Sequence, residues 1–188
     1  MQTAIAIDGQ QVADYLEAHH LVLVTAESCT AGLIASGLAD VPGAGAVLES
    51  AFVVYSPHAK HKQLGVKPAT IETHGLTSEA VALEMARGAL ARSDANVAIA
   101  NTGVADVQAE DPDLEPGTQC FAWVFRTGPL TEQAFTETRV FSGGRNAVRE
   151  AAAEHALDGL VDHHRCIPPC ALGTGPGSGP RQEWTERP

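Results

Sequence analysis

The sequence is poor in basic residues, in aromatic residues and in long apolar runs. Its 188 residues include 12 Lys and Arg against 23 Asp and Glu, which gives a formal net charge of −11. Proteins that bind nucleic acid normally carry a basic surface stripe, so the charge argues against such a partner. Glu, His or Gly interrupts each apolar run within about 10 residues, whereas a membrane helix needs roughly 20. We therefore expect neither a nucleic-acid-binding protein nor a membrane protein.

Cysteine is also scarce, and the beginning of the chain carries no export signal. The four cysteines are too few to form a disulfide framework in a chain of this length. Residues Met1 to Asp8 lack the basic flank and the apolar stretch of a signal peptide. These features predict a cytoplasmic protein. The 44% hydrophobic and 19% charged content excludes a wholly disordered chain.

Helical and strand-like hydrophobic patterns alternate along most of the chain. Strands are expected at residues 21–25, 49–55, 96–102, 120–125 and 135–141, and helices at 10–20, 32–40, 58–63, from 78 onward, and at 145–163. The last two strands are close enough in sequence to form a hairpin, whereas helices separate the others. The order predicts an α/β fold, a three-layer α/β/α sandwich with a mixed sheet.

The composition changes near the C-terminus. Residues 165–188 are rich in proline and glycine and have no hydrophobic periodicity. We expect residues 1–164 to form the folded domain and residues 165–188 to form a mobile tail.

A group of metal-binding residue types lies at this boundary: His163, His164, Cys166 and Cys170. Imidazole and thiolate are preferred ligands of transition metals. The spacing of the four residues matches no closed zinc motif, and two prolines stiffen the intervening turn. Adventitious binding is the interpretation we prefer, and no specific metal site is predicted.

The turn after the first predicted strand, Ala26 to Gly32, is the first candidate site. Ser28, Cys29 and Thr30 lie where the free N–H groups and the positive end of the next helix favour an anion. Ligands of open α/β sheets bind outside the carboxyl ends of strands, where this turn is expected. In the alternative interpretation, Ser28 or Thr30 only caps the helix. Cys29 is either a thiol nucleophile activated by the helix or a partly buried structural residue, and we prefer the second.

The second candidate site follows the second predicted strand, where Ser56 and Pro57 are expected to begin a short helix. Lys60 would lie in its first turn, where the helix dipole disfavours the charged ammonium group. A lysine with a lowered pKa can act as a general base, and the hydroxyl of Tyr55 or Ser56 can relay the proton. The alternative is that residues 58–62 form a solvated basic patch.

From about residue 10 to residue 160 the sequence resembles the CinA C-terminal domain family. The resemblance depends on the ordered occurrence of many short motifs rather than on any one of them. The main motifs are Thr25-Ala-Glu-Ser-Cys-Thr30, Phe52-Val-Val-Tyr-Ser56, Ala59-Lys60, Ser78-Glu79, Thr102-Gly103, Gly117-Thr118, and Phe141 with Gly143, Arg145 and Arg149.

The resemblance implies an amidohydrolase that converts nicotinamide mononucleotide to nicotinic acid mononucleotide and ammonia without a metal or another cofactor. It also implies a three-layer α/β/α domain that pairs into homodimers. By position, Lys60 would be the general base and Tyr55 would position or relay, while Ser28 would hold the carboxamide or act as nucleophile. Arg145 would bind the phosphate. Further substrate contacts are expected from Thr30, Ser56, Thr102 and Gly103.

Three departures from the family pattern bear on activity. Ala31 stands where the family has glycine. Ala44 and Gly45 replace a serine pair; if the second serine is the nucleophile of the family, Ser28 or Ser56 has to take its place. The family's glycine-rich loop is acidic here, with five carboxylates between residues 106 and 115. The competing hypothesis is a non-catalytic or altered-specificity paralogue that binds a different small molecule or a protein partner.

Overall fold

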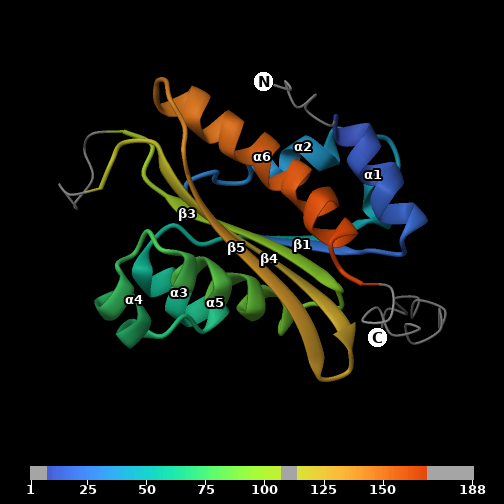
Figure 1. Ribbon diagram of the computed structural model, residues 1–188, viewed down its shortest axis with the longest axis horizontal. Helices are drawn as coiled ribbons and strands as arrows, with labels where there is room; N and C mark the ends of the chain where they lie inside the picture. The colour runs from blue at the N-terminus through green and yellow to red at the C-terminus, as the bar shows by residue number, and fades with distance from the viewer. Residues whose placement is uncertain (1–7, 107–113, 169–188) are drawn as a thin grey trace, which may run out of the picture.

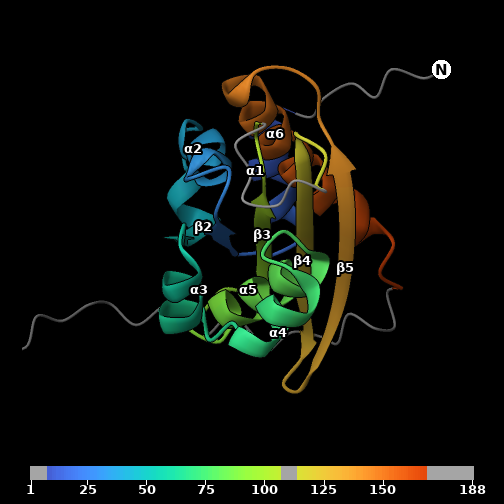
Figure 2. The ribbon, with the colours of Figure 1, turned by 90° about the vertical axis from the view of Figure 1, so that its left-hand side faces the viewer.

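The computed structural model describes residues 8–106 and 114–168. Its centre is one mixed sheet of five strands in the order β2-β1-β3-β4-β5 (Figures 1 and 2). The strands are β1 (Leu23–Glu27), β2 (Leu48–Val53), β3 (Val97–Gly103), β4 (Thr118–Gly128) and β5 (Thr131–Val140). β1 is parallel to both β2 and β3, whereas β4 is antiparallel to β3 and β5. The predicted mixed sheet and the predicted hairpin are confirmed.

Helices cover both faces of the sheet (Figure 1). One face carries α1 (Gly9–Ala18), α2 (Leu33–Ala39) and α6 (Arg145–Arg165), and the other carries α3 (Pro57–Leu64), α4 (Pro68–His74) and α5 (Glu79–Leu90). This is the three-layer sandwich expected from the sequence. The short helix α4 was not predicted, because it buries no residue and so has no apolar periodicity. Among the described residues, no helix is long and apolar enough to cross a membrane.

The two faces of the sheet differ in the size of their side chains. Large residues point toward α1, α2 and α6: Leu23, Ile99, Phe121, Trp123 and Phe125. Small residues point toward α3 and α5: Ala26, Ala98, Ala100 and Ala122. On this side of the sheet α5 also approaches α3 closely, since a Cβ on Gly88 would overlap the carbonyl oxygen of Leu64, the last residue of α3. Close packing of this kind holds the end of α3 firmly, and α3 carries Lys60.

The connections around β1 diverge at its carboxyl end. The chain leaves β1 through α2, on one face, to reach β2, and returns through α3, α4 and α5, on the other face, to reach β3 on the opposite side of β1. Open α/β sheets bind their ligands in a crevice at such a point, so we refer to the carboxyl end of β1 and the loops beside it as the crevice. The turn that begins at Ser28 lies at this point.

The C-terminal helix extends slightly beyond the predicted domain boundary. α6 ends at Arg165, and Ile167 is buried in the core beside α1. The remainder of the predicted tail, residues 169–188, lies outside the described residues.

Candidate active site

A lysine and a serine meet at the carboxyl end of β1. The Nζ atom of Lys60 lies 2.7 Å from Oγ of Ser28 and also donates to the carbonyl oxygens of Val54 at 2.9 Å and Tyr55 at 3.2 Å. Lys60 is completely buried, and Ser28 is 7% exposed. Burial lowers the pKa of Lys60 to about 8. The lowered pKa was expected from the helix dipole, but the main cause is the loss of solvent around the ammonium group.

The helix that carries Lys60 begins as the sequence predicted. Ser56 is the N-cap of α3, and its Oγ accepts a hydrogen bond from the amide of Ala59 at 3.1 Å. This cap occupies one acceptor lone pair of Ser56, whose predicted contact with substrate stays a prediction. Two neighbours of Lys60, His58 and Lys62, are exposed. The interpretation as a solvated basic patch therefore describes these neighbours and is wrong for Lys60.

Glu27, which sequence reasoning missed, shapes the turn after β1. Its buried carboxylate accepts hydrogen bonds from the amides of Gly32 at 2.7 Å, Ile34 at 3.2 Å and Ala35 at 3.0 Å. The N-cap residue of α2 is Gly32, so capping by Ser28 or Thr30 is wrong. The internal carboxylate also satisfies the first amides of α2, so an anion bound to the turn has to use its other amides, and the expected anion site stays a prediction. No local capping rule describes a strand-end carboxylate that accepts from amides five to eight residues later, so the sequence carried no signal for this role.

Asn101 and Gln119, two buried residues with amide side chains, support the same turn. The backbone carbonyl oxygen of Asn101 accepts a hydrogen bond from the backbone amide of Ser28 at 3.0 Å. Its side-chain Oδ1 accepts one from the backbone amide of Thr30 at 3.2 Å. Asn101 in turn donates to Gln119 at 3.0 Å. A Cβ on Gly103 would lie 2.4 Å from Oε1 of Gln119, so glycine is needed there to admit this side chain. The structure thus gives Gly103 a positioning role, and its predicted contact with substrate stays a prediction.

The turn contains a strained backbone at the position where the family has glycine. Ala31 has φ of 50°, in the left-handed region. Arg149, a second residue that sequence reasoning did not assign, donates from Nε to the carbonyl oxygen of Cys29 at 2.9 Å and from Nη2 to that of Thr30 at 3.1 Å. These two bonds and the Glu27 contacts fix the turn in a conformation that costs an L-residue roughly 1–2 kcal/mol.

Ala31→Gly is expected to stabilise the protein by about 1 kcal/mol, because glycine adopts the left-handed region without the steric cost of a Cβ. Urea unfolding followed by circular dichroism measures the change. Ala39→Gly, at the exposed last residue of α2, is the control and should not stabilise the protein. Equal effects of the two substitutions would show that the turn is not strained.

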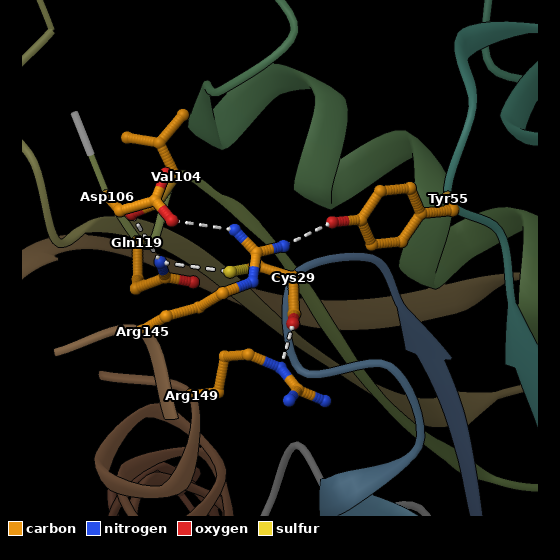
Figure 3. A network of polar contacts seen from close by, with 7 residues as sticks. All are labelled: Cys29, Tyr55, Val104, Asp106, Gln119, Arg145 and Arg149. Carbon is orange, nitrogen blue, oxygen red and sulfur yellow. Dashed lines mark hydrogen bonds and ion pairs between the residues drawn. The ribbon is translucent and has the colours of Figure 1, made fainter. Parts of the chain in front are cut away.

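Arg145 contacts two partners, Asp106 and Tyr55 (Figure 3). Its Nη1 lies 3.0 Å from Oδ2 of Asp106, and its Nη2 donates to the hydroxyl of Tyr55 at 2.9 Å. Tyr55 therefore joins the two parts of the site: its carbonyl oxygen contacts Lys60 and its hydroxyl contacts Arg145. The hydrogen bond with Asp106 is the main reason that the pKa of Arg145 lies above its usual value.

The remaining polar residues of the crevice are buried. Burial raises the pKa of the Cys29 thiol, whose sulfur accepts from Nε2 of Gln119 at 3.3 Å. The raised pKa favours the structural interpretation of Cys29. The hydroxyl of Thr102 donates to the carbonyl oxygen of Leu76 at 3.2 Å. The hydroxyl of Thr30 is buried and has no hydrogen-bond partner among the described residues. Substrate contacts by Thr30 and Thr102 stay predictions.

The position of the missing family serine lies away from this crevice within the chain. Gly45 is exposed on a short 3₁₀ helix, Ala44–Ala46, that precedes β2. Ser28 and Lys60 lie beyond the carboxyl ends of β1 and β2, and the six residues of β2 separate the two ends by roughly 20 Å. Within one chain, the Ser28–Lys60 pair therefore forms without any contribution from Gly45.

His163, His164 and Cys166, which belong to the C-terminal group of possible metal ligands, lie in different surroundings. The His163 ring stacks on Phe135, with centroids 4.6 Å apart, whereas Nδ1 of His164 lies 2.9 Å from the hydroxyl of Tyr15. Cys166 is exposed, and Cys170 lies outside the described residues. Among the residues that the structure describes, no three His, Cys, Asp or Glu side chains are arranged to hold a metal ion.

The fold and the crevice together define a three-layer α/β/α domain with a buried serine–lysine pair at a strand end. The chain belongs to the CinA C-terminal domain family, whose model matches residues 8–163. The resemblance found in the sequence is thereby confirmed.

Relatives of two lengths match this chain. The nicotinamide-nucleotide amidohydrolase PncC of Escherichia coli K12 is 38% identical over 152 residues, which cover 81% of this chain and 90% of that protein. A putative competence-damage inducible protein of Symbiobacterium thermophilum is 43% identical over 152 residues, 79% of this chain and 36% of that protein. A CinA-like protein of Akkermansia muciniphila is 40% identical over 157 residues, 84% of this chain and 37% of that protein. The chain thus spans little more than a third of the longer relatives.

Solved structures confirm the fold class. A CinA superfamily protein of Klebsiella pneumoniae superposes with a TM-score of 0.79 at 33% sequence identity, covering 85% of this chain and 96% of that one. A competence/damage inducible protein of Agrobacterium tumefaciens gives a TM-score of 0.74 at 34% identity, covering 87% of this chain and 99% of that one.

Proposed function

We propose that this chain is an amidohydrolase that converts nicotinamide mononucleotide to nicotinic acid mononucleotide and ammonia. The proposal depends on one observation above all, the 2.7 Å contact between the buried Nζ of Lys60 and Oγ of Ser28. A hydroxyl paired with a lysine of lowered pKa is an activated nucleophile that needs neither a metal nor an organic cofactor. The choice of substrate is supported by the E. coli relative named as a nicotinamide-nucleotide amidohydrolase.

In the first half of the reaction, neutral Lys60 accepts the Ser28 proton while Oγ attacks the carboxamide carbon. The C–N bond then breaks, and the Lys60 ammonium group returns the proton to the departing nitrogen, which leaves as ammonia. In the second half, Lys60 takes a proton from water, which attacks the ester carbon. The C–O bond of the ester then breaks while the Lys60 ammonium group returns its proton to Oγ of Ser28, and the released carboxylic acid ionises to the carboxylate.

The charge that develops on the carbonyl oxygen needs donors near Ser28. Glu27 and Asn101 occupy most amides of the turn, but the amides of Cys29 and Ala31 have no acceptor among the described residues. We assign these two amides to the oxyanion. Arg149 and Glu27 would then act by fixing the turn in the conformation that presents both N–H groups.

Tyr55 and Arg145 are assigned to the nucleotide part of the substrate. Arg145 is the candidate phosphate ligand, and Tyr55 holds its guanidinium group from one side. Because the Tyr55 hydroxyl contacts Arg145 and only its carbonyl oxygen contacts Lys60, positioning is favoured over proton relay. A cytoplasmic location and a homodimeric assembly remain predictions.

One contact favours the competing hypothesis of altered specificity. The carboxylate of Asp106 occupies Arg145, the group expected to bind phosphate. Purified protein should therefore first be assayed for stoichiometric ammonia and nicotinic acid mononucleotide from nicotinamide mononucleotide. Release of both products in equal amounts supports the proposed function. Binding of the nucleotide without release of either product would favour a paralogue that does not hydrolyse it.

The rate should depend on pH through Lys60. The lysine acts as a base only when neutral, and its pKa is about 8. We expect kcat/KM to rise about tenfold per pH unit below 8 and to level off above it, with about a tenth of the maximal value at pH 7. Initial rates of ammonia release between pH 6 and pH 10 measure the profile. A flat profile through pH 8 would contradict the assignment of Lys60 as base.

A further inference from the structure

At the mouth of the crevice, the carboxylate of Asp106 contacts Arg145, the residue expected to bind phosphate. The Asp106–Arg145 ion pair, at 3.0 Å, joins two half-exposed side chains, 41% and 50% accessible. Asp106 follows β3 in the loop beside the carboxyl end of β1, and Arg145 begins α6, so the pair joins these two segments (Figure 3).

Arg145 is held on both sides. Nη1 faces Asp106 and Nη2 donates to the Tyr55 hydroxyl. A guanidinium group binds phosphate best when two parallel N–H groups are available to the same oxyanion. Here the two terminal nitrogens serve different partners, and the positive charge is balanced by Asp106. The other arginine of the site, Arg149, directs Nε and Nη2 to carbonyl oxygens of the turn.

The carboxylate of Asp106 opposes the binding of a phosphorylated substrate at this position. A nucleotide phosphate monoester carries a charge of about −1.5 to −2 at pH 7. To reach Arg145 it must displace Asp106 or lie beside it. A dianion about 6 Å from one negative charge is repelled by an amount worth about tenfold in binding even at the dielectric constant of water.

Asp106 suits a substrate of a different charge. A pyridinium nucleoside without phosphate is a cation, which a carboxylate attracts, and its ribose hydroxyls can donate to carboxylate oxygens. Acidic side chains bind ribose hydroxyls in this way in other α/β proteins. The Ser28–Lys60 pair would meet the same carboxamide in both compounds.

Building on the proposed function, we infer that Asp106 is a specificity-determining residue that lets this site accept the unphosphorylated pyridinium nucleoside, nicotinamide riboside, as well as or better than the nucleotide. The carboxylate of Asp106 withholds Arg145 from phosphate and receives the ribose. The reaction itself, hydrolysis of the carboxamide to carboxylate and ammonia, is unchanged.

The test compares both compounds in the full chain and in Asp106→Asn, which removes one charge and keeps the shape of the side chain. We expect wild-type kcat/KM for the riboside to equal or exceed that for the nucleotide. Asp106→Asn should raise the value for the nucleotide about tenfold and change that for the riboside by less than about threefold. Glu17→Gln, which removes an exposed charge on α1, is the control and should leave the ratio unchanged.

A binding measurement separates this inference from the proposed function. Calorimetric titration of both compounds into Ser28→Ala protein, with and without Asp106→Asn, gives the ratio of the two dissociation constants without turnover. A ratio that Asp106→Asn does not shift toward the nucleotide overturns the inference, as does a wild-type preference for the nucleotide. Absence of ammonia from the nucleotide overturns the proposed function, whereas the binding ratio still decides the role of Asp106.

Discussion

Lys60→Met is expected to lower kcat for ammonia release about 1,000-fold or more and to leave the fold intact, because Met fills the same volume but cannot accept a proton. Lys60 is the only candidate base within 3 Å of Ser28 Oγ among the described residues. Steady-state ammonia release measures the loss, and circular dichroism with thermal unfolding measures the fold. Lys62→Met, an exposed lysine on the same helix, is the control and should retain full activity.

Stability should change little in Lys60→Met, since two effects oppose each other. The substitution deprives the carbonyl oxygens of Val54 and Tyr55 of a donor, which destabilises by about 1–3 kcal/mol. It also removes a buried ammonium group whose lowered pKa shows that burial disfavours its charge. An active Lys60→Met protein would contradict the mechanism directly. An unfolded one would be replaced by Lys60→Gln, which retains a donor for the carbonyl oxygens.

The positions of Ser28 and Lys60 at strand ends were predictable, because hydrophobic periodicity and the capping rules apply there. Alternating helices and strands placed Ser28 and Lys60 each at the end of a predicted strand. The structure shows that these two strands are parallel neighbours, which brings the two residues to the same edge of the sheet. Ser56 and Pro57 indicated the helix start that brings Lys60 back toward β1. The structure adds the reason for the low pKa of Lys60: burial, which a helix wheel of a short segment between exposed His58 and Lys62 could not show.

Contacts that neither periodicity nor the capping rules describe were not predictable. Glu27 displaced the hydroxyl residues as cap of α2 because a strand-end carboxylate reaches three amides at once, and no local rule describes this. Arg149 lies about 120 residues from the turn that it holds. The acidic loop was recognised as a departure from the family, but its ion pair with Arg145 depends on how α6 is placed against the end of β3.

Ser28→Ala is expected to lower kcat about 10,000-fold or more, because no other hydroxyl contacts Lys60 among the described residues and the covalent step is lost. Cys29→Ala provides the matched comparison on the adjacent residue. The Cys29 thiol has a raised pKa and contacts Gln119 rather than Lys60, so its removal should cost less than about tenfold in kcat.

The same pair of variants identifies the covalent intermediate. Acid quenching of wild-type protein during turnover, followed by peptide mass analysis, should find an acyl ester on Ser28, and Cys29→Ala protein should give the same adduct. If the adduct is lost in Cys29→Ala and activity is retained in Ser28→Ala, the nucleophile is the Cys29 thiol and not Ser28. Because Oγ of Ser28 and Nζ of Lys60 lie within hydrogen-bond distance before any substrate binds, the hydroxyl needs no rearrangement to lose its proton, and the ester on Ser28 is the outcome that this geometry requires.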